Sequence, residues 1–223
     1  MWRLLLVVVI ASLGLAACGD DEVDVQEFYR RLSALENGTF TVTYEMETIT
    51  KSETEVRDLV WYHDRVADFP LPLERVDLSG DFGFIARISG PIAYACGGEA
   101  GVDRLCSLDG RRVSEPEHWF VRPTLDRNRA TVIDSWSERI AGYEAECYEI
   151  ETVPVAAPYA THEMCLSEDG LLLFGETGPF ESPDPDVAGM VISMIAIEAK
   201  TEVADDAFEP PYPVIDRTGS QAE

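Results

Sequence analysis

The chain has 223 residues with 42 acidic and 17 basic side chains, and its formal net charge at pH 7 is −25. This length favours one domain or at most two small ones, and 46% apolar residues are enough to bury a core. The acidic excess argues against nucleic acid as a partner and against a polybasic membrane-binding patch, because both need clustered Lys and Arg.

The first residues have the pattern of a lipoprotein signal peptide. Arg3 precedes an apolar run, Leu4 to Leu15, that is too short to cross a bilayer as a helix. The sequence Leu15-Ala16-Ala17-Cys18 follows and resembles the bacterial lipobox. This resemblance implies that residues 1–17 are removed and that Cys18 carries the lipid, with more than one acyl chain for stable anchoring. The alternative is an ordinary secretory signal with an incidental cysteine.

Residues 18–24 are predicted to form an acidic tether between the lipid and the folded body. Loss of residues 1–17 removes Arg3 alone among the charged residues, so the mature chain has a formal charge of −26. Gly19 follows Cys18, so an inner-membrane retention signal of the Asp type is absent. We expect a lipid anchor on the outer face of the bacterial cell membrane, or on the outer membrane if the host has two membranes.

The periodicity of apolar residues predicts one helix followed by many strands. A helical spacing over residues 25–36 ends at Asn37-Gly38, and strict alternation over residues 39–50 predicts a strand with one buried face. Residues 114–136 are the least strand-like and are predicted to be irregular, with a helical turn or two. The other predicted strands cover residues 55–63, 73–78, 82–89, 91–96, 102–108, 137–140, 144–153, 162–166, 171–177 and 190–203.

These elements predict an α+β fold that is mainly β. Consecutive strands are close enough for antiparallel pairing, and a sheet of about ten strands must curl or split. One or two helices are available to cover one face. We therefore expect a single domain over residues 25–213, followed by a tail over residues 214–223.

Four cysteines remain when Cys18 is set aside, and an even number in an exported protein predicts two disulfides. Three connectivities are possible and the sequence does not decide among them. We favour the local pairs, Cys96 with Cys106 and Cys147 with Cys165, because each would link a hairpin. A zinc site is the weaker alternative, since no C-x-x-C occurs and the three histidines have no ligand spacing.

The order of these features resembles a known family of extracytoplasmic lipoproteins, those of the LolA/LolB and LppX/LprG architecture. The segments that carry the resemblance are the lipobox, the short helix, the strand GTFTVTY, Trp61-Tyr62, Arg75-Val76-Asp77, the two cysteine pairs, Ile140-Ala141-Gly142 and Phe208-Glu209-Pro210-Pro211. The resemblance covers most of residues 25–213. It implies a strongly curved antiparallel half-barrel, closed by helices on its concave side, with a cavity for acyl chains.

The sequence contains no motif of a hydrolase, a nucleotide-binding protein or a zinc protease, so we predict no enzyme and no cofactor. No metal site is predicted either, because acidic pairs such as Asp205/Asp206 lack an EF-hand pattern. The candidates for lining an apolar cavity are Tyr44, Trp61, Trp119, Phe120 and Trp136. The alternative is that these aromatic residues simply form the core.

Our first hypothesis is a membrane-anchored binding module for an acyl chain or similar apolar ligand. The second is an envelope lipoprotein with a self-packed sheet and an unknown protein partner, which an exposed apolar patch or an unpaired edge strand would favour. A hydrolytic function would require buried titratable groups that converge in a cleft.

Overall fold

The computed structural model describes residues 25–65, 72–80, 83–89, 93–98, 103–109, 130–152, 159–180 and 188–215. The predictions for Cys18, the signal peptide, the tether, Trp119 and Phe120 lie outside these residues. The one helix among them, α1 (Val25–Asn37), has 13 residues. No helix in the described part of the chain is long and apolar enough to span a membrane.

Strands make up most of the described structure, as predicted. Strand β1 (Thr39–Ile49) follows α1 directly and alternates buried with more exposed residues, as its sequence does. The other strands are β2 (Thr54–Asp64), β3 (Leu73–Gly80), β4 (Gly83–Ser89), β5 (Ala93–Gly98), β6 (Leu105–Asp109), β7 (Ala130–Ile140), β8 (Tyr143–Thr152), β9 (Tyr159–Ser167), β10 (Leu172–Phe180), β11 (Val191–Lys200) and β12 (Val214–Ile215).

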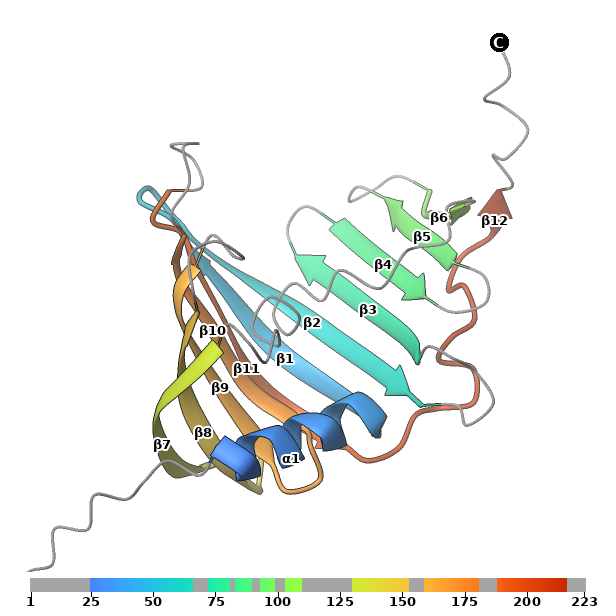
Figure 1. Ribbon diagram of the computed structural model, residues 1–223. Helices are drawn as coiled ribbons and strands as arrows, with labels where there is room; N and C mark the ends of the chain where they lie inside the picture. Colours follow the sequence, from blue (N-terminus) through green and yellow to red (C-terminus); the bar gives the residue numbers. More distant parts are fainter. Residues whose placement is uncertain are drawn as a thin grey trace, which may run out of the picture.

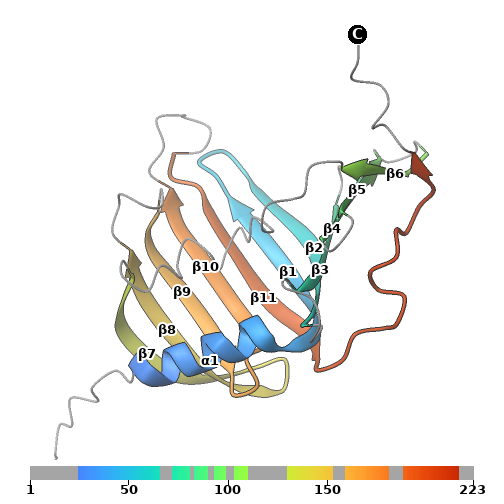
Figure 2. The ribbon, with the colours of Figure 1, turned by 45° about the vertical axis from the view of Figure 1, so that its right-hand side comes forward.

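All of these strands form one open, strongly curved sheet, and α1 lies across its concave side (Figures 1 and 2). The strand order is β12-β6-β5-β4-β3-β2-β1-β11-β10-β9-β8-β7. From β1 to β6, and again from β7 to β11, strands that follow each other in the sequence therefore lie next to each other in the sheet. The antiparallel pairing of β1 with β11 joins these two halves, and β12 pairs in parallel with β6. The predicted α+β half-barrel is confirmed.

The strand register separates two faces of the sheet. The inner face is the one that α1 covers, because the ring of Phe28 lies 4.9 Å from the ring of Tyr148 in β8. It carries most of the core, including Val42, Tyr44 and Met46 of β1. Residues at alternate positions, such as Glu45 and Glu47, lie on the opposite side, which we call the outer face.

The turn between β9 and β10 fixes α1 against one end of the sheet. Gly170 has a φ of +82°, and a Cβ there would lie 2.3 Å from the backbone nitrogen of Leu35. Only glycine accepts both the left-handed conformation and this close approach. The three consecutive residues Leu171, Leu172 and Leu173 are all buried in the main core.

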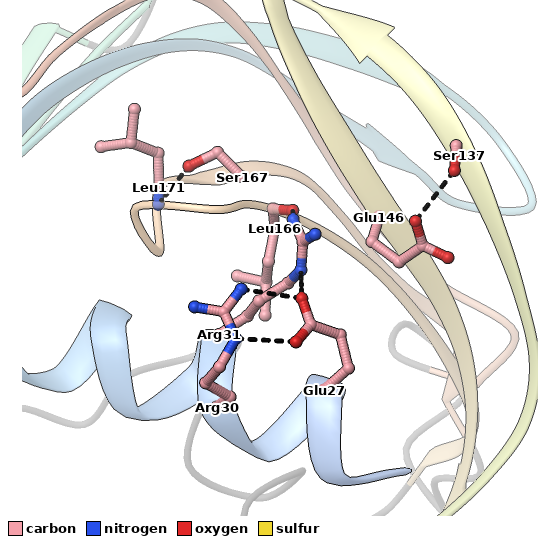
Figure 3. A network of polar contacts seen from close by, with 8 residues as sticks. All are labelled: Glu27, Arg30, Arg31, Ser137, Glu146, Leu166, Ser167 and Leu171. Atoms are coloured by element: carbon pink, nitrogen blue, oxygen red, sulfur yellow. Dashed lines mark hydrogen bonds and ion pairs between the residues drawn. The ribbon is translucent and has the colours of Figure 1, made fainter. Parts of the chain in front are cut away.

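Polar contacts add to this packing. Arg31 donates to the carbonyl oxygen of Leu166 at 2.9 Å, and Glu27 accepts hydrogen bonds from Arg30 and Arg31 (Figure 3). These contacts tie the first turns of α1 to the end of β9.

A hydrogen bond also links the β7–β8 hairpin to β11. Tyr143 of β8 donates to the carbonyl of Ala199 in β11 at 3.1 Å. The tip of the β7–β8 hairpin therefore passes across the ends of β9 and β10.

One predicted segment is wrong in part. Residues 130–136 were expected to be irregular or helical, but they are the first part of β7. The cause is a bulge between Val132 and Asp134, which interrupts the alternation of buried and exposed positions. Beyond the expected domain boundary at residue 213, Val214 and Ile215 form the short strand β12.

Two disulfides link directly paired residues of neighbouring strands. Cys96 of β5 is bonded to Cys106 of β6, and Cys147 of β8 is bonded to Cys165 of β9. These are the two local pairings favoured from the sequence. Cys147 and Cys165 belong to the main core, whereas Cys96 and Cys106 form a small separate cluster with Tyr94 and Tyr212.

Candidate functional site

The inner face carries a row of apolar and flexible side chains that crosses five strands. The register aligns Met46 of β1, Met194 of β11, Gly175 of β10, Met164 of β9 and Tyr148 of β8. Each of these residues is buried. Methionine is unbranched and polarizable, so a row of this kind adapts its packing to irregular apolar shapes. We call it the inner methionine row.

Gly175 lies in the middle of the inner methionine row. A Cβ at this position would meet only the flexible side chain of Met194, at 3.3 Å. The end of the Met194 side chain occupies the place that a side chain at Gly175 would take, in a row where every other member carries a large side chain. This makes Gly175 the position at which an added side chain would change the inner face most directly.

Two of the predicted cavity residues lie on the inner face. Tyr44 is fully buried and donates from its hydroxyl to the carbonyl of Leu172 at 2.8 Å, and burial raises the pKa of this phenol. Trp61 of β2 pairs with Val42 and packs edge-on against Phe40, with 5.1 Å between ring centroids. Both residues belong to the core that forms the wall of the inner face.

Trp136, in contrast, lies on the outer face. It pairs with Cys147, while the neighbouring Ser135 pairs with the inner-face residue Tyr148. Successive residues of a strand point to opposite sides, so Trp136 cannot join Tyr44 and Trp61 on one surface. Trp136 instead packs beside Cys147 at the edge of the main core. Trp119 and Phe120 lie outside the described residues.

The inner face also carries buried polar groups. His162 lies in the row next to the inner methionine row, and burial lowers its pKa to about 4, so its ring is neutral at pH 7. His63 stacks on Phe40 at 4.9 Å and bonds through Nδ1 to the carbonyl of Gly38 at 2.9 Å. Burial lowers the pKa of His63 as well.

Glu74 of β3 is buried beside His63, with 3.7 Å between His63 Nε2 and a carboxylate oxygen. The lowered pKa of His63 and this separation both argue against a strong ion pair at neutral pH. Two buried titratable groups thus converge, but they lie in the core wall beside Phe40 and Trp61. The pocket lined by Tyr62 and Arg75 includes neither of them.

A pocket of about 310 Å³ lies on the other side of the sheet, beneath residues 201–215, which we call the C-terminal strap. Arg75 forms its base and binds Asp77 through two contacts of 2.7 Å, while it donates to the carbonyls of Ala207 and Glu209. The guanidinium also lies over the ring of Tyr62. Every nitrogen of Arg75 is occupied, so the pocket serves to hold the strap.

One group of potential metal ligands occurs among the described residues, namely Glu138, Cys147 and Cys165. The two sulfur atoms are joined in a disulfide, and metal binding requires thiolates. The group therefore does not make a metal site.

The sequence predicted the apolar inner wall through Tyr44 and Trp61 but missed the inner methionine row. Met46, Met164 and Met194 lie far apart in the chain and each occupies an ordinary buried position of its own strand. Only the register of four neighbouring strands aligns them, so no local pattern in the sequence identifies the row.

Comparisons with known proteins give a match in structure and none in sequence. No protein-family model matches the chain, and no curated protein does. The crystal structure of MucB is 15% identical, with a TM-score of 0.51, and the match covers 83% of this chain and 62% of MucB. The complex of MucA and MucB from Pseudomonas aeruginosa gives 16% identity and a TM-score of 0.51, with 83% and 60% covered.

This chain therefore spans about three fifths of the length of MucB. A LolA superfamily protein from Nitrosomonas europaea matches over 82% of this chain and 97% of its own, at 13% identity and a TM-score of 0.24. The architecture, an open curved sheet with a helix on its concave side, is a fold that this chain shares with MucB over 83% of its length. At these identities the similarity concerns the fold alone.

Proposed function

We propose that the protein is a lipid-anchored extracytoplasmic lipoprotein that binds an acyl chain or another apolar ligand on its inner face. The observation that carries this proposal is the inner methionine row, an adaptable apolar surface that crosses five strands on the concave side of the sheet. Tyr44 and Trp61 extend the same apolar wall. The proposal contains no catalytic step.

The charge of the chain limits the ligand. A formal charge near −25 repels anionic head groups, so we expect the polar part of the ligand to be neutral or cationic. The polar groups buried on the inner face agree with this, because His63 and His162 are both neutral at pH 7. The cation nearest to the inner methionine row is Arg57, which lies opposite Met46, and its charge is already paired with Glu55.

The test is native mass spectrometry of the protein purified from its own host, followed by extraction of the bound lipid. We expect the unaltered protein to carry an acyl lipid and Gly175→Phe to lose most of it, because the added ring fills the middle of the inner methionine row. Gly178→Phe is the matched control, since a Cβ there has no atom within 4 Å. Circular dichroism verifies that both variants fold.

Two results would contradict the proposal. One is unaltered protein without any bound lipid, and the other is lipid retained equally by Gly175→Phe and Gly178→Phe.

Anchoring is tested separately through Cys18. The variant Cys18→Ser should be released in soluble form, because the lipobox reaction requires the cysteine sulfur. The measurement is the fraction of protein that stays with membranes after a carbonate wash. Retention of the serine variant would overturn the lipid anchor without affecting the inner-face proposal.

A protein partner is the second candidate function. The solved complex of MucA and MucB is an assembly of two proteins in which one has this fold, although this chain covers only 60% of that chain. The observation that favours this function here is a set of aliphatic side chains exposed on the outer face, namely Val56, Ile195 and Ile197. Apolar groups that remain exposed together on a sheet are typical of a binding surface.

A further inference from the structure

A row of carboxylates crosses the outer face of the sheet. The register places Asp134 of β7 opposite Glu149 of β8, Glu149 opposite Glu163 of β9, and Glu163 opposite Glu176 of β10. The same row continues through a serine of β11 to Glu47 of β1. We call these five acidic residues the outer acidic row. Four of them occupy directly paired positions on four consecutive strands.

This arrangement opposes folding. Like charges directly opposite each other on neighbouring strands destabilise a sheet. Burial, together with the charges of Glu176 and Glu149, raises the pKa of Glu163 above its usual range. No Lys or Arg of the described residues forms an ion pair with any member of the row. Within the described part of the chain, the repulsion is therefore not compensated by a cation.

Aliphatic side chains border the outer acidic row on the same face. Val56 of β2 continues it beyond Glu47 and is 54% exposed. In the adjacent row, Ile195 of β11 lies opposite Glu45 and is 44% exposed. The pairing of β1 with β11 contains a bulge close to Ile195, at which β11 has one residue without a partner in β1. This residue is Ile197, which is 59% exposed. These three side chains therefore face solvent.

We propose that this outer surface binds a basic amphipathic helix of a partner protein, whose Lys or Arg stripe pairs with the outer acidic row and whose aliphatic stripe packs on Ile195 and its exposed neighbours. The inference names a surface for the second candidate function and is independent of lipid binding on the inner face.

The spacing of the charges favours a helix as the occupant. Neighbouring strands lie about 4.8 Å apart, and on a convex surface the side-chain ends spread somewhat further. Residues one turn apart on an α-helix are separated by about 5.4 Å, which matches this spacing. Side chains on one face of an extended segment repeat at about 6.7 Å, and these would lose register with the row within a few strands.

Charge also decides between this occupant and two others. A second copy of the chain has the same formal charge of −25, so its approach to the row is repelled. A membrane with anionic lipids is repelled for the same reason. A cationic protein segment is attracted, and its aliphatic residues provide the contacts that a simple counterion lacks.

The experiment uses the purified chain and a fluorescent helical peptide with Lys at positions i, i+4, i+7 and i+11, flanked by Leu. Its affinity is measured by anisotropy with the unaltered chain, with Glu163→Gln/Glu176→Gln, and with Glu202→Gln/Asp205→Asn. Glu202 and Asp205 are exposed residues of the C-terminal strap, so the control pair removes the same number of charges outside the row. A second peptide carries Ser in place of each Leu.

We expect Glu163→Gln/Glu176→Gln to weaken binding by about tenfold and the control pair to weaken it by less than about twofold, because screened surface charges outside the contact contribute little. The Leu-to-Ser peptide should also bind about tenfold more weakly. The thermal midpoint of Glu163→Gln/Glu176→Gln should rise, since the repulsion within the row is reduced. This rise also verifies that the variant folds.

Equal weakening by the row variant and the control pair would overturn the proposal, because it would indicate attraction to net charge alone. Undiminished binding of the Leu-to-Ser peptide would do the same. Lipid content of the same preparations, measured by mass spectrometry, reports separately on the inner-face function.

Discussion

At the scale of single residues, the stability of glycine and histidine variants tests how closely the chain is packed around these positions. Gly170 and Gly142 both have positive φ angles, but only Gly170 lies against the helix backbone. The cost of a left-handed backbone can therefore be separated from the cost of steric contact by the same substitution at the two positions.

Gly170→Ala should destabilise the chain by about 3 kcal/mol or more, because the methyl group would collide with the backbone of Ala34 and Leu35. Gly142→Ala should cost only about 1 kcal/mol, since nothing lies within 4 Å and only the conformational penalty applies. Urea unfolding of the two variants measures both values. Equal losses would contradict the position of α1 against the β9–β10 turn.

His162 predicts an acid sensitivity with a definite sign. Its pKa is about 4 in the folded chain against 6.5 in a model compound, so the unfolded chain binds the proton first as the pH falls. The stability from the neutral ring is complete above about pH 6.5 and is lost between there and about pH 4. His162→Gln should reduce this loss.

The measurement is the free energy of unfolding at pH 7 and pH 4.5 in both proteins. His63 also has a lowered pKa, but it is present in both and cancels in the comparison. An unchanged pH dependence in His162→Gln would show that the ring is solvated.

At the scale of elements, Arg75 attaches the middle of the C-terminal strap, around Ala207 and Glu209. Arg75→Met would leave Asp77 buried without its partner and would remove the donors to Ala207 and Glu209. Breaking a buried pair by removing one member costs about 3 kcal/mol. We expect that loss, together with faster amide exchange over residues 204–211.

Arg139→Met provides the control, because Arg139 and its partner Glu144 are both largely exposed. Its effect should stay within about 0.5 kcal/mol. Slow exchange of the strap in Arg75→Met would contradict the role of Arg75 as its attachment.

The sequence predicted regular elements well and relations between elements poorly. The helix and β1 each have a single clear period, so their ends differ from the prediction by only one residue. In β7, the bulge at Val132 and Asp134 breaks the period, and the strand was partly missed. The face of Trp136 and the alignment of Glu149 with Glu163 depend on register between strands, which no local pattern contains.

At the scale of the whole molecule, two clusters of different size hold the sheet together. The main core extends from α1 through β1, β2 and β8 to β11, whereas the outer strands β5 and β6 rest on a small cluster around the Cys96–Cys106 disulfide. One disulfide therefore lies in the large core and the other in a small cluster, which we expect to open more easily than the large core.

Each disulfide should contribute about 3 kcal/mol by constraining the unfolded chain. Cys147→Ala/Cys165→Ala should lower the midpoint of the main unfolding transition, since both residues belong to the main core. Cys96→Ala/Cys106→Ala should instead accelerate amide exchange in β5 and β6 and leave the main transition nearly unchanged. Calorimetry with amide exchange measures both effects, and a single shared transition would contradict the division into two clusters.

The pairing of β1 with β11 has a consequence for the order of folding. Residues 39–49 meet residues 191–200, so the centre of the sheet is made by segments that lie about 150 residues apart in the chain. A chain that crosses a membrane from its amino end would present the edge of β1 long before β11 follows. Contacts this distant form slowly. If the chain is exported as proposed, completion of the half-barrel is coupled to the end of export. A product that stops before residue 191 would expose the open edges of two separate half-sheets.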